Sequence, residues 1–173
     1  MGGYRAPLRV DLAGGWTDLA PYTHDHGGEV VNFTIDKWVI ATPTGGGNVD
    51  FQFEVPTGSG LGTSGALNVA KIASLGVDDL TDLDAIAESA FEAETKNGNR
   101  CGRQDQWASA HGGFNRFLFI GDGVEHLPFE PAPSARKWLH KHLIIAHSGI
   151  QHKSGDMQEL VWSRYDAGDP VVI

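Results

Sequence analysis

Hydrophobic and polar positions along the chain fall either into alternating stretches or into stretches with helical spacing. Alternation, or enrichment in Val, Ile, Phe, Thr and Trp, predicts extended segments at residues 5–13, 29–42, 50–55 and 114–129. Apolar positions three and four residues apart predict helices at residues 64–75 and 82–96. We therefore expect an α+β fold in which one sheet is backed by these helices.

Shorter features complete the predicted order of elements. Residues 36–37 interrupt the second extended segment, and Gly121-Asp122-Gly123 predicts a hairpin turn within the fourth. Residues 22–28 are polar and indicate a loop. Further along, we predict a short buried strand at Leu143–Ala146 and a helix at Ser154–Tyr165.

The first extended segment carries two charged side chains that point the same way. Its alternation places Leu8, Val10 and Leu12 on one face of a half-buried strand. Arg9 and Asp11 then share the opposite face. The strand therefore presents a cation and a carboxylate side by side.

Two other carboxylates have two readings each. Asp18 lies in a polar loop after the first strand, where it either binds a ligand or acts as a turn or cap residue. Glu94 continues the apolar stripe of the helix at 82–96. A carboxylate on an inward face is costly unless it is paired, hydrated or bound to a cation. Alternatively, the apolar stripe reaches the edge of the protein at Glu94 and the carboxylate is solvated there. Both interpretations stay open.

The most distinctive stretch is residues 55–70, where glycines and hydroxyl residues lead directly into a helical pattern. Glycines let backbone N–H groups approach a ligand closely, and a helix N-terminus adds unpaired donors and a positive dipole end. The stretch is therefore a candidate phosphate-binding loop. The alternative is a glycine-rich turn that only caps a helix. Its glycines and hydroxyl residues are Gly58, Gly60, Gly62 and Gly65 with Ser59, Thr63 and Ser64.

Two well-known nucleotide-binding motifs do not fit this stretch. A P-loop has a lysine directly before its Ser or Thr, and no lysine precedes Thr63. A dinucleotide-binding fold needs an acidic strand end about twenty residues further on, where residues 78–84 indicate a helix start instead. A dinucleotide-dependent oxidoreductase is therefore the least favoured class of function.

Length and composition narrow the class of protein further. The 173 residues suit one domain, or one domain plus the start of another, and 40% hydrophobic residues suffice for a core. A net charge of −9 makes nucleic acid a poor partner. The sequence contains no apolar run of about 18 residues, so we predict no membrane span. The absence of a signal sequence favours a cytoplasmic location. The single cysteine, Cys101, excludes an internal disulfide and a cysteine zinc site.

Three segments resemble motifs of the GHMP kinases, the galacto-, homoserine, mevalonate and phosphomevalonate kinases. Ala6–Asp18 (APLRVDLAGGWTD) resembles their N-terminal motif. Pro56–Ala66 (PTGSGLGTSGA) resembles their phosphate loop, with Thr63-Ser64-Gly65 in place of a serine run. Gly102–Gln106 (GRQDQ) resembles the segment that carries the catalytic aspartate of the sugar kinases. The combination is most similar to the branch of heptose 7-phosphate kinases and fucokinases.

This resemblance implies a fold and an activity. The fold would be the family's N-terminal, ribosomal-protein-like domain with a left-handed βαβ unit at residues 1–133, followed by the beginning of the C-terminal domain at 134–173. The activity would be ATP-dependent phosphorylation of a sugar hydroxyl, the anomeric one, with Mg²⁺. Only the start of a second domain matches, and residues 36–55 are far shorter than in the family. A truncated relative that binds sugar, nucleotide or a partner chain without turnover is therefore the alternative of another class, and a homodimer is one option for the oligomeric state.

The resemblance also implies roles for individual residues. Asp105 matches the base that takes the hydroxyl proton, and Arg9 matches the cation near the transferred phosphoryl group. Ser64 and Glu94 match the magnesium ligands, and Asp18 matches the sugar-binding aspartate. The remaining implied positions are Gly58, Ser59, Gly60, Leu61, Gly62 and Thr63, with Ser64, for the nucleotide phosphates, and Gly15, Thr17 and Arg103 for the substrate.

The charge of the acceptor sugar makes a further demand on the chain. A sugar that already carries a phosphate, as heptose 7-phosphate does, needs a second cationic pocket away from the glycine-rich loop. Candidates for this pocket are Arg100, Arg103 and Lys153, which the sequence does not rank. A neutral sugar of the L-fucose type has no such need.

Overall fold

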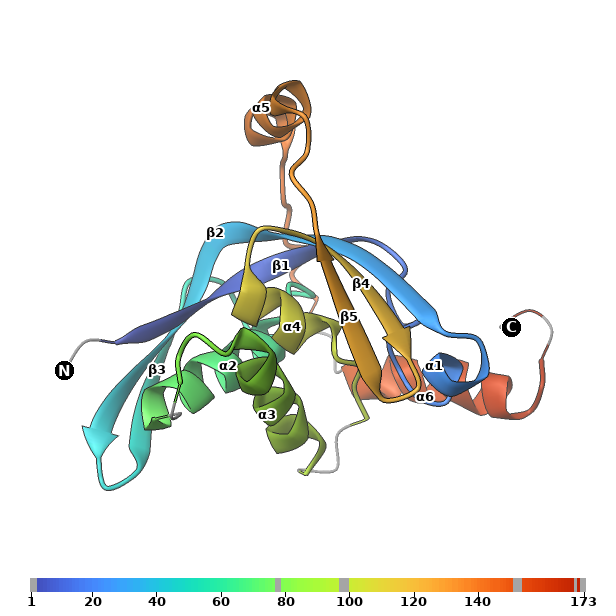
Figure 1. Ribbon diagram of the computed structural model, residues 1–173, viewed down its shortest axis with the longest axis horizontal. Coiled ribbons are helices and arrows are strands. Elements are labelled where there is room, and N and C mark those ends of the chain that lie inside the picture. The colour runs from blue at the N-terminus through green and yellow to red at the C-terminus, as the bar shows by residue number, and fades with distance from the viewer. Residues whose placement is uncertain (1–2, 77–78, 97–99, 151–153, 170, 172–173) are drawn as a thin grey trace.

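A computed structural model of the chain describes residues 3–76, 79–96, 100–150, 154–169 and 171. An antiparallel sheet forms one layer, and three consecutive helices lie against its lower face in the view of Figure 1. A further helix projects above the sheet, and the last helix lies below the far end of the sheet, beside the short first helix. This is the predicted α+β arrangement of one sheet backed by helices.

The sheet consists of β1 (Tyr4–Ala13), β2 (Gly28–Gly45), β3 (Asn48–Phe53), β4 (Phe114–Ile120) and β5 (Gly123–Pro128). The long strand β2 pairs with β1 along one edge and with β3 and β4 along the other, and β5 pairs with β4. All of these described pairings are antiparallel. The four predicted extended segments and the hairpin are confirmed, and an all-parallel sheet is excluded for these strands. The left-handed βαβ unit stays a prediction.

The predicted interruption at residues 36–37 is a bulge within a continuous strand. Pro7 of β1 lies opposite Trp38, while the next residue, Leu8, lies opposite Ile35, so β2 has two extra residues between these pairs. A second register shift follows near the end of β1 and reorients the strand. As a result Leu12, predicted on the buried face, is 54% exposed.

The helices of the covering layer are α2 (Thr63–Leu75), α3 (Leu83–Thr95) and α4 (Gln104–His111), and the others are α1 (Tyr22–Asp25), α5 (Pro133–His142) and α6 (Ser154–Asp166). The helices predicted at 64–75, 82–96 and 154–165 are confirmed. The loop predicted at 22–28 contains the single helical turn α1. In the described part of the chain, no helix combines the length and the apolarity that crossing a bilayer requires.

The segment after β5 differs most from the prediction. Helix α5 is not predicted by any apolar stripe, and none of its residues is buried. The buried strand predicted at Leu143–Ala146 is wrong: these residues form no described strand, and Ile144 is 87% exposed. An apolar run is buried only where another element packs against it, and the described elements leave this run open.

The main core lies between the sheet and the helices α2 and α3. Small residues also let helices of the covering layer approach one another closely, as Gly65 of α2 shows. A Cβ atom at Gly65 would lie 2.6 Å from the Cβ of Asp105 on α4. This contact fixes the start of α4 against the start of α2. The buried residues of the core are Ala6, Leu8, Val39, Ala41, Ala66, Val69, Ala70, Ile86 and Ala90.

Two histidine rings pack together where α4 meets β5. The ring centroids of His111 and His126 are 4.1 Å apart, and His126 stacks on the buried Phe117 at 4.9 Å. The Nε2 atom of His126 lies 2.8 Å from Asn115 Oδ1, and that of His111 lies 2.9 Å from the carboxylate of Asp84. Burial, together with the neighbouring His111, lowers the pKa of His126 to about 4, and Asp84 opposes this shift. Burial also lowers the pKa of His111, and Asp84 opposes that shift.

These shifted pKa values predict that the two histidines destabilise the fold in acid. An unfolded histidine titrates at about 6.5, so between that pH and the lower folded pKa the unfolded chain binds more protons than the folded chain. The contribution of these histidines to the free energy of unfolding should therefore fall as the pH drops through this range, while the raised pKa of Asp18 contributes in the opposite direction. Urea unfolding near neutral pH and at about pH 5 should show a smaller loss for His126→Gln than for the wild type. The control is His140→Gln on the exposed α5; an equal loss in all three proteins would contradict the prediction.

Candidate active site

Arg9 of β1 joins the glycine-rich loop to the first turn of α4. Its Nε and Nη2 atoms both lie 2.7 Å from Oδ1 of Asp105. Its Nη1 donates to the carbonyl of Gly60 at 2.7 Å, and its backbone N–H donates to the carbonyl of Leu61 at 3.1 Å. Both contacts to Asp105 end on one oxygen, and within the described residues no donor reaches the other. Asp105 Oδ2 is therefore open to a ligand.

The glycine-rich loop has the geometry of an anion cradle. Gly58, Gly60 and Gly62 have φ angles of +72°, +78° and +72°, which favour glycine. Gly62 is the N-cap of α2 and supplies no side-chain cap, so the first N–H groups of the helix are available to a ligand. The hydroxyl of Ser59 is buried without a hydrogen-bond partner among the described residues. These unpaired donors fit the phosphates of a nucleotide.

The cradle and the Arg9–Asp105 pair are one site. A Cβ atom at Gly62 would lie 3.2 Å from Cγ of Arg9 and 3.3 Å from Cγ of Asp105. At Gly60, by contrast, a Cβ atom would meet nothing within 4 Å. The loop therefore backs onto the ion pair at Gly62 and stays open at Gly60. A phosphate held by the loop would lie beside Asp105.

Glu94 of α3 is buried among neutral donors. It is only 8% exposed, so the reading in which the apolar stripe ends at the protein edge is wrong. Its carboxylate accepts hydrogen bonds from Ser64 Oγ (2.5 Å), Asn68 Nδ2 (3.2 Å) and Gln106 Nε2 (2.7 Å). No Lys or Arg of the described segments is paired with it. A buried carboxylate without a counter-charge fits a cation site.

Glu94 and Ser64 have the oxygen ligands that a magnesium ion could use. Mg²⁺ is bound through one or two carboxylates together with waters and substrate phosphates. Ser64 lies in the first turn of α2, directly beside the cradle, and its hydroxyl already contacts Glu94. The described residues contain no cluster of three or more His, Cys, Asp or Glu side chains that could hold a metal by protein ligands alone. A metal at Glu94 and Ser64 would therefore depend on waters and phosphate oxygens for its other ligands.

Asp18, in the loop after β1, lies against the N-terminus of α4, whose first residue, Gln104, directly precedes Asp105. It is 4% exposed and accepts a hydrogen bond from the backbone N–H of Gln104 at 2.9 Å. Burial raises the pKa of Asp18 to about 6, and the hydrogen bond from Gln104 opposes the shift. Gly102 is required here, because a Cβ atom would lie 1.9 Å from Asp18 Oδ2. Asp18 thus anchors α4, and direct contact with a sugar stays a prediction.

Asp11 is a site residue that the implied roles left out. Burial raises the pKa of its carboxyl, while the positive charge of Arg9 opposes that shift and the negative charge of Asp105 adds to it. A Cβ atom at Gly15 would lie 2.1 Å from Asp11 Oδ2, so the loop after β1 closes directly over this carboxylate. The alternation of β1 places Asp11 on the same face as Arg9, and this pattern could have identified Asp11 as a site residue.

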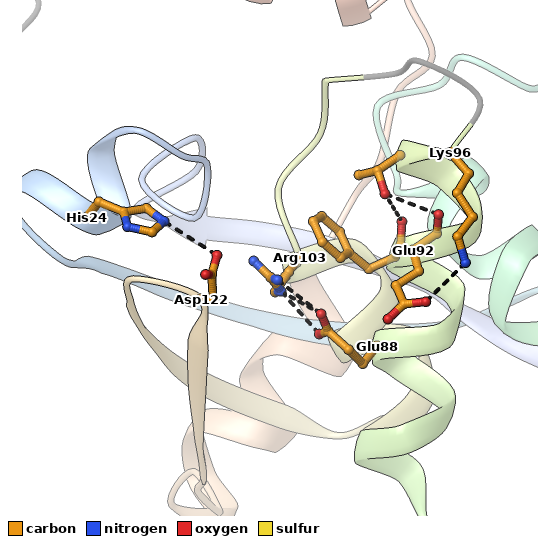
Figure 2. Close-up of polar contacts among 8 residues, drawn as sticks. His24, Glu88, Glu92, Lys96, Arg103 and Asp122 are labelled. Carbon is orange, nitrogen blue, oxygen red and sulfur yellow. Dashed lines mark hydrogen bonds and ion pairs between the residues drawn. The ribbon is translucent and has the colours of Figure 1, made fainter.

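Two of the residues implied to bind substrate, Thr17 and Arg103, already form hydrogen bonds or ion pairs with other residues of the protein. The hydroxyl of Thr17 donates to the carbonyl of Gly14 at 2.7 Å and accepts the backbone N–H of Glu29 at 3.1 Å. Arg103 points at Glu88, as Figure 2 shows, with N–O distances of 3.0 to 3.2 Å, and its guanidinium lies 4.0 Å from the ring centroid of Phe91.

Arg100 and Lys153 are the two other candidates for a cationic pocket that binds a sugar phosphate. Arg100 lies 5.1 Å from the ring centroid of Trp162 and donates to the carbonyl of Ala20 at 3.3 Å. Arg100 is exposed and forms no ion pair with a carboxylate of the described residues. Lys153 lies outside the described residues. Of the candidates that the structure describes, Arg100 is therefore less neutralised than Arg103.

A pocket of about 230 Å³ opens beside the loop that carries Asp18. Its walls come from the loop after β1, from α1 and from α6. It therefore brings together segments that are more than a hundred residues apart in the sequence. The lining residues are Gly15, Trp16, Thr17, Tyr22, Val161, Trp162 and Tyr165.

Comparison with known proteins gives a family match and a shared fold. The sequence model of the GHMP kinases N terminal domain matches residues 29–113. A stretch of 32 residues, 18% of this chain and 3% of the relative, is 56% identical to L-fucokinase/L-fucose-1-P guanylyltransferase of Bacteroides fragilis. The solved D-glycero-D-manno-heptose 1-phosphate kinase from Bacteriodes thetaiotaomicron is similar with a TM-score of 0.66 and 24% identity. That similarity covers 82% of this chain and 62% of the solved chain, so the chain spans less than two thirds of this relative.

Proposed function

Residues 29–113 form a GHMP kinase N-terminal domain, and on this premise we propose that the chain is the nucleotide-binding part of an ATP-dependent sugar kinase. One observation carries the proposal: the Arg9–Asp105 pair lies directly against the glycine-rich loop at Gly62. A helix N-terminus alone would suit any anion. Phosphoryl transfer to a hydroxyl also requires a group that orients the hydroxyl and accepts its proton. Asp105, with one oxygen open to a ligand beside the glycine-rich loop, can supply this group.

In the proposed reaction, the glycine-rich loop binds the ATP phosphates and Asp105 orients the sugar hydroxyl. The hydroxyl oxygen forms a bond to the γ-phosphorus, and its proton passes to the carboxylate of Asp105. The bond between the γ-phosphorus and the bridging oxygen breaks, and ADP leaves. Arg9 holds Asp105 and faces the charge of the transferred group. Ser64 and Glu94 would hold Mg²⁺, which neutralises phosphate charge when bound.

The first candidate acceptor is the anomeric hydroxyl of a heptose 7-phosphate. Support comes from the motif combination and from the shared fold with the heptose kinase. An L-fucose-type sugar is the second candidate, because the short match of 56% identity is to an L-fucokinase. The two acceptors differ in charge, which makes them separable by experiment.

The proposed domain division places the catalytic part in residues 1–133 and the beginning of a second domain in residues 134–173. Its support is the exposed apolar surface of α5 and of the segment after it. Trp138 and Ile144 are 60% and 87% exposed. Side chains of this size are usually covered by another part of the protein. In a non-catalytic relative the same surface could bind a partner chain, but such a protein would have no use for Asp105 beside the cradle.

Turnover of a sugar and of its terminal phosphate tests the acceptor. If the acceptor is a sugar phosphate, Arg100 is its expected partner, and Arg100→Gln should raise KM for the sugar phosphate about 10–100-fold by removing a charge-assisted hydrogen bond. KM for the neutral sugar should not change. The matched control is Arg136→Gln, which removes an exposed arginine of α5. Equal turnover of both sugars would remove the argument for a phosphate pocket, and no sugar-dependent ADP release with either would contradict the kinase proposal.

A further inference from the structure

The pocket beside the Asp18 loop is lined mainly by aromatic rings. Trp16, Tyr22, Trp162 and Tyr165 supply four of its seven lining residues, and none of the seven carries a charge. The hydroxyl of Thr17 is already bonded within its own loop. A pocket with these walls does not suit a phosphate. It suits a flat, uncharged group with an apolar face.

The walls of the pocket are held in place by contacts between distant segments. Tyr165 of α6 donates its hydroxyl to Asp25 of α1 at 2.8 Å and meets the ring of Trp162 edge-on at 5.3 Å. The rings of Tyr22 and Tyr165 are 6.0 Å apart. Trp162 is 3% exposed and packs with Leu19. The rings are therefore arranged before any ligand arrives.

Trp16 is the member of this set whose backbone is strained. Its φ angle is +77°, and it is the one non-glycine residue with positive φ among those described. A bulky residue rarely adopts this conformation, and such outliers concentrate at functional sites. Trp16 is also 38% exposed, although its ring lines the pocket. A large aromatic residue thus lines the pocket from a backbone conformation that is unfavourable for it.

The pocket is next to the candidate catalytic pair. Gly15, which precedes Trp16, lies against the carboxylate of Asp11. Asp11 in turn interacts electrostatically with both Arg9 and Asp105. The pocket and the Arg9–Asp105 pair are therefore connected through Gly15 and Asp11.

We propose that Trp16 is the stacking surface for the apolar face of a pyranose ring bound in this pocket. This inference rests on the proposed function, and it adds the binding mode of the acceptor. The sugar ring is held through its C–H face by aromatic side chains. Any terminal phosphate then lies outside the pocket, where Arg100 stacks on the ring of Trp162.

The test compares Trp16→Ala with Trp16→Phe, using L-fucose and D-glycero-D-manno-heptose 7-phosphate as probes. Trp16→Ala should raise KM for the accepted sugar about 10-fold, whereas Trp16→Phe, which keeps a ring, should restore most of the affinity. KM for ATP should stay unchanged in both. The matched control is Trp138→Ala, because Trp138 is exposed on α5, away from the pocket. Thermal unfolding of each variant establishes that the fold is kept.

A binding measurement separates this inference from the proposed function. Sugar added without ATP should quench tryptophan fluorescence in the wild type and in Trp138→Ala, but not in Trp16→Ala. Quenching without any sugar-dependent ADP release would support the stacking site and contradict the kinase. ADP release with an unchanged sugar KM in Trp16→Ala would support the kinase and overturn the stacking site. Absence of binding by either sugar to the wild type would overturn it as well.

Discussion

Replacing Asp105 by Asn should lower turnover about 10²–10⁴-fold, the usual share of a positioned base. The amide keeps the shape of the side chain but cannot accept the hydroxyl proton. Because the glycine-rich loop and the pocket are untouched, the affinities for ATP and sugar should change little. The measurement is steady-state ADP release with the preferred sugar, together with ATP affinity by titration calorimetry.

The control for this variant is Asp122→Asn. Asp122 lies in the β4–β5 turn and forms an exposed ion pair with His24, which Figure 2 shows. This variant should keep wild-type turnover. Asp105→Asn also loses the ion pair with Arg9, so its unfolding temperature should be measured alongside. Near-native turnover in a folded Asp105→Asn protein would mean that Asp105 only holds Arg9 and the start of α4.

Replacing Gly62 by Val should weaken ATP binding at least about tenfold, a cost of roughly 1.4 kcal/mol. The φ angle of +72° is unfavourable for valine, and its side chain would press on Arg9 and Asp105. The variant disturbs the cradle and the ion pair together.

Gly76→Val is a matched control for this second prediction. Gly76 follows the same helix, has a φ angle of +91°, and a Cβ atom there would meet nothing within 4 Å. It should therefore show comparable backbone strain with unchanged ATP affinity. Calorimetric titration of both variants with ATP and Mg²⁺ gives the comparison. Equal affinities in two folded variants would contradict the cradle.

The parts of the fold that depend on neighbouring residues could be predicted from the sequence. Alternation gave the direction of Arg9, and helical spacing placed Glu94 on the inward face of α3. Asp82 caps α3 and accepts the N–H of Ala85 at 3.0 Å. In each case the cause lies within a few positions along the chain.

The hydrogen-bond and ion-pair partners of individual polar side chains could not be predicted, because these partners are distant in the sequence. Thr17 is held by Glu29 across the sheet edge, and Arg103 is held by Glu88 of α3. Neither partner is indicated by the motifs around Thr17 or Arg103. The prediction of a buried strand at Leu143–Ala146 was wrong for the same reason, because an apolar run does not identify the element that would cover it. The aromatic pocket likewise forms only when α6 meets the loop after β1.

The central claim is that the chain transfers the γ-phosphoryl group of ATP to a sugar at Asp105. Phosphorus NMR of the protein with ATP, Mg²⁺ and each probe sugar tests it most directly, because the method identifies the product as well as ADP. We predict a new phosphomonoester of the sugar in step with ADP, and neither signal at the same enzyme concentration with Asp105→Asn. No sugar phosphoester in the wild type, or ADP formed together with free phosphate alone, would contradict the account.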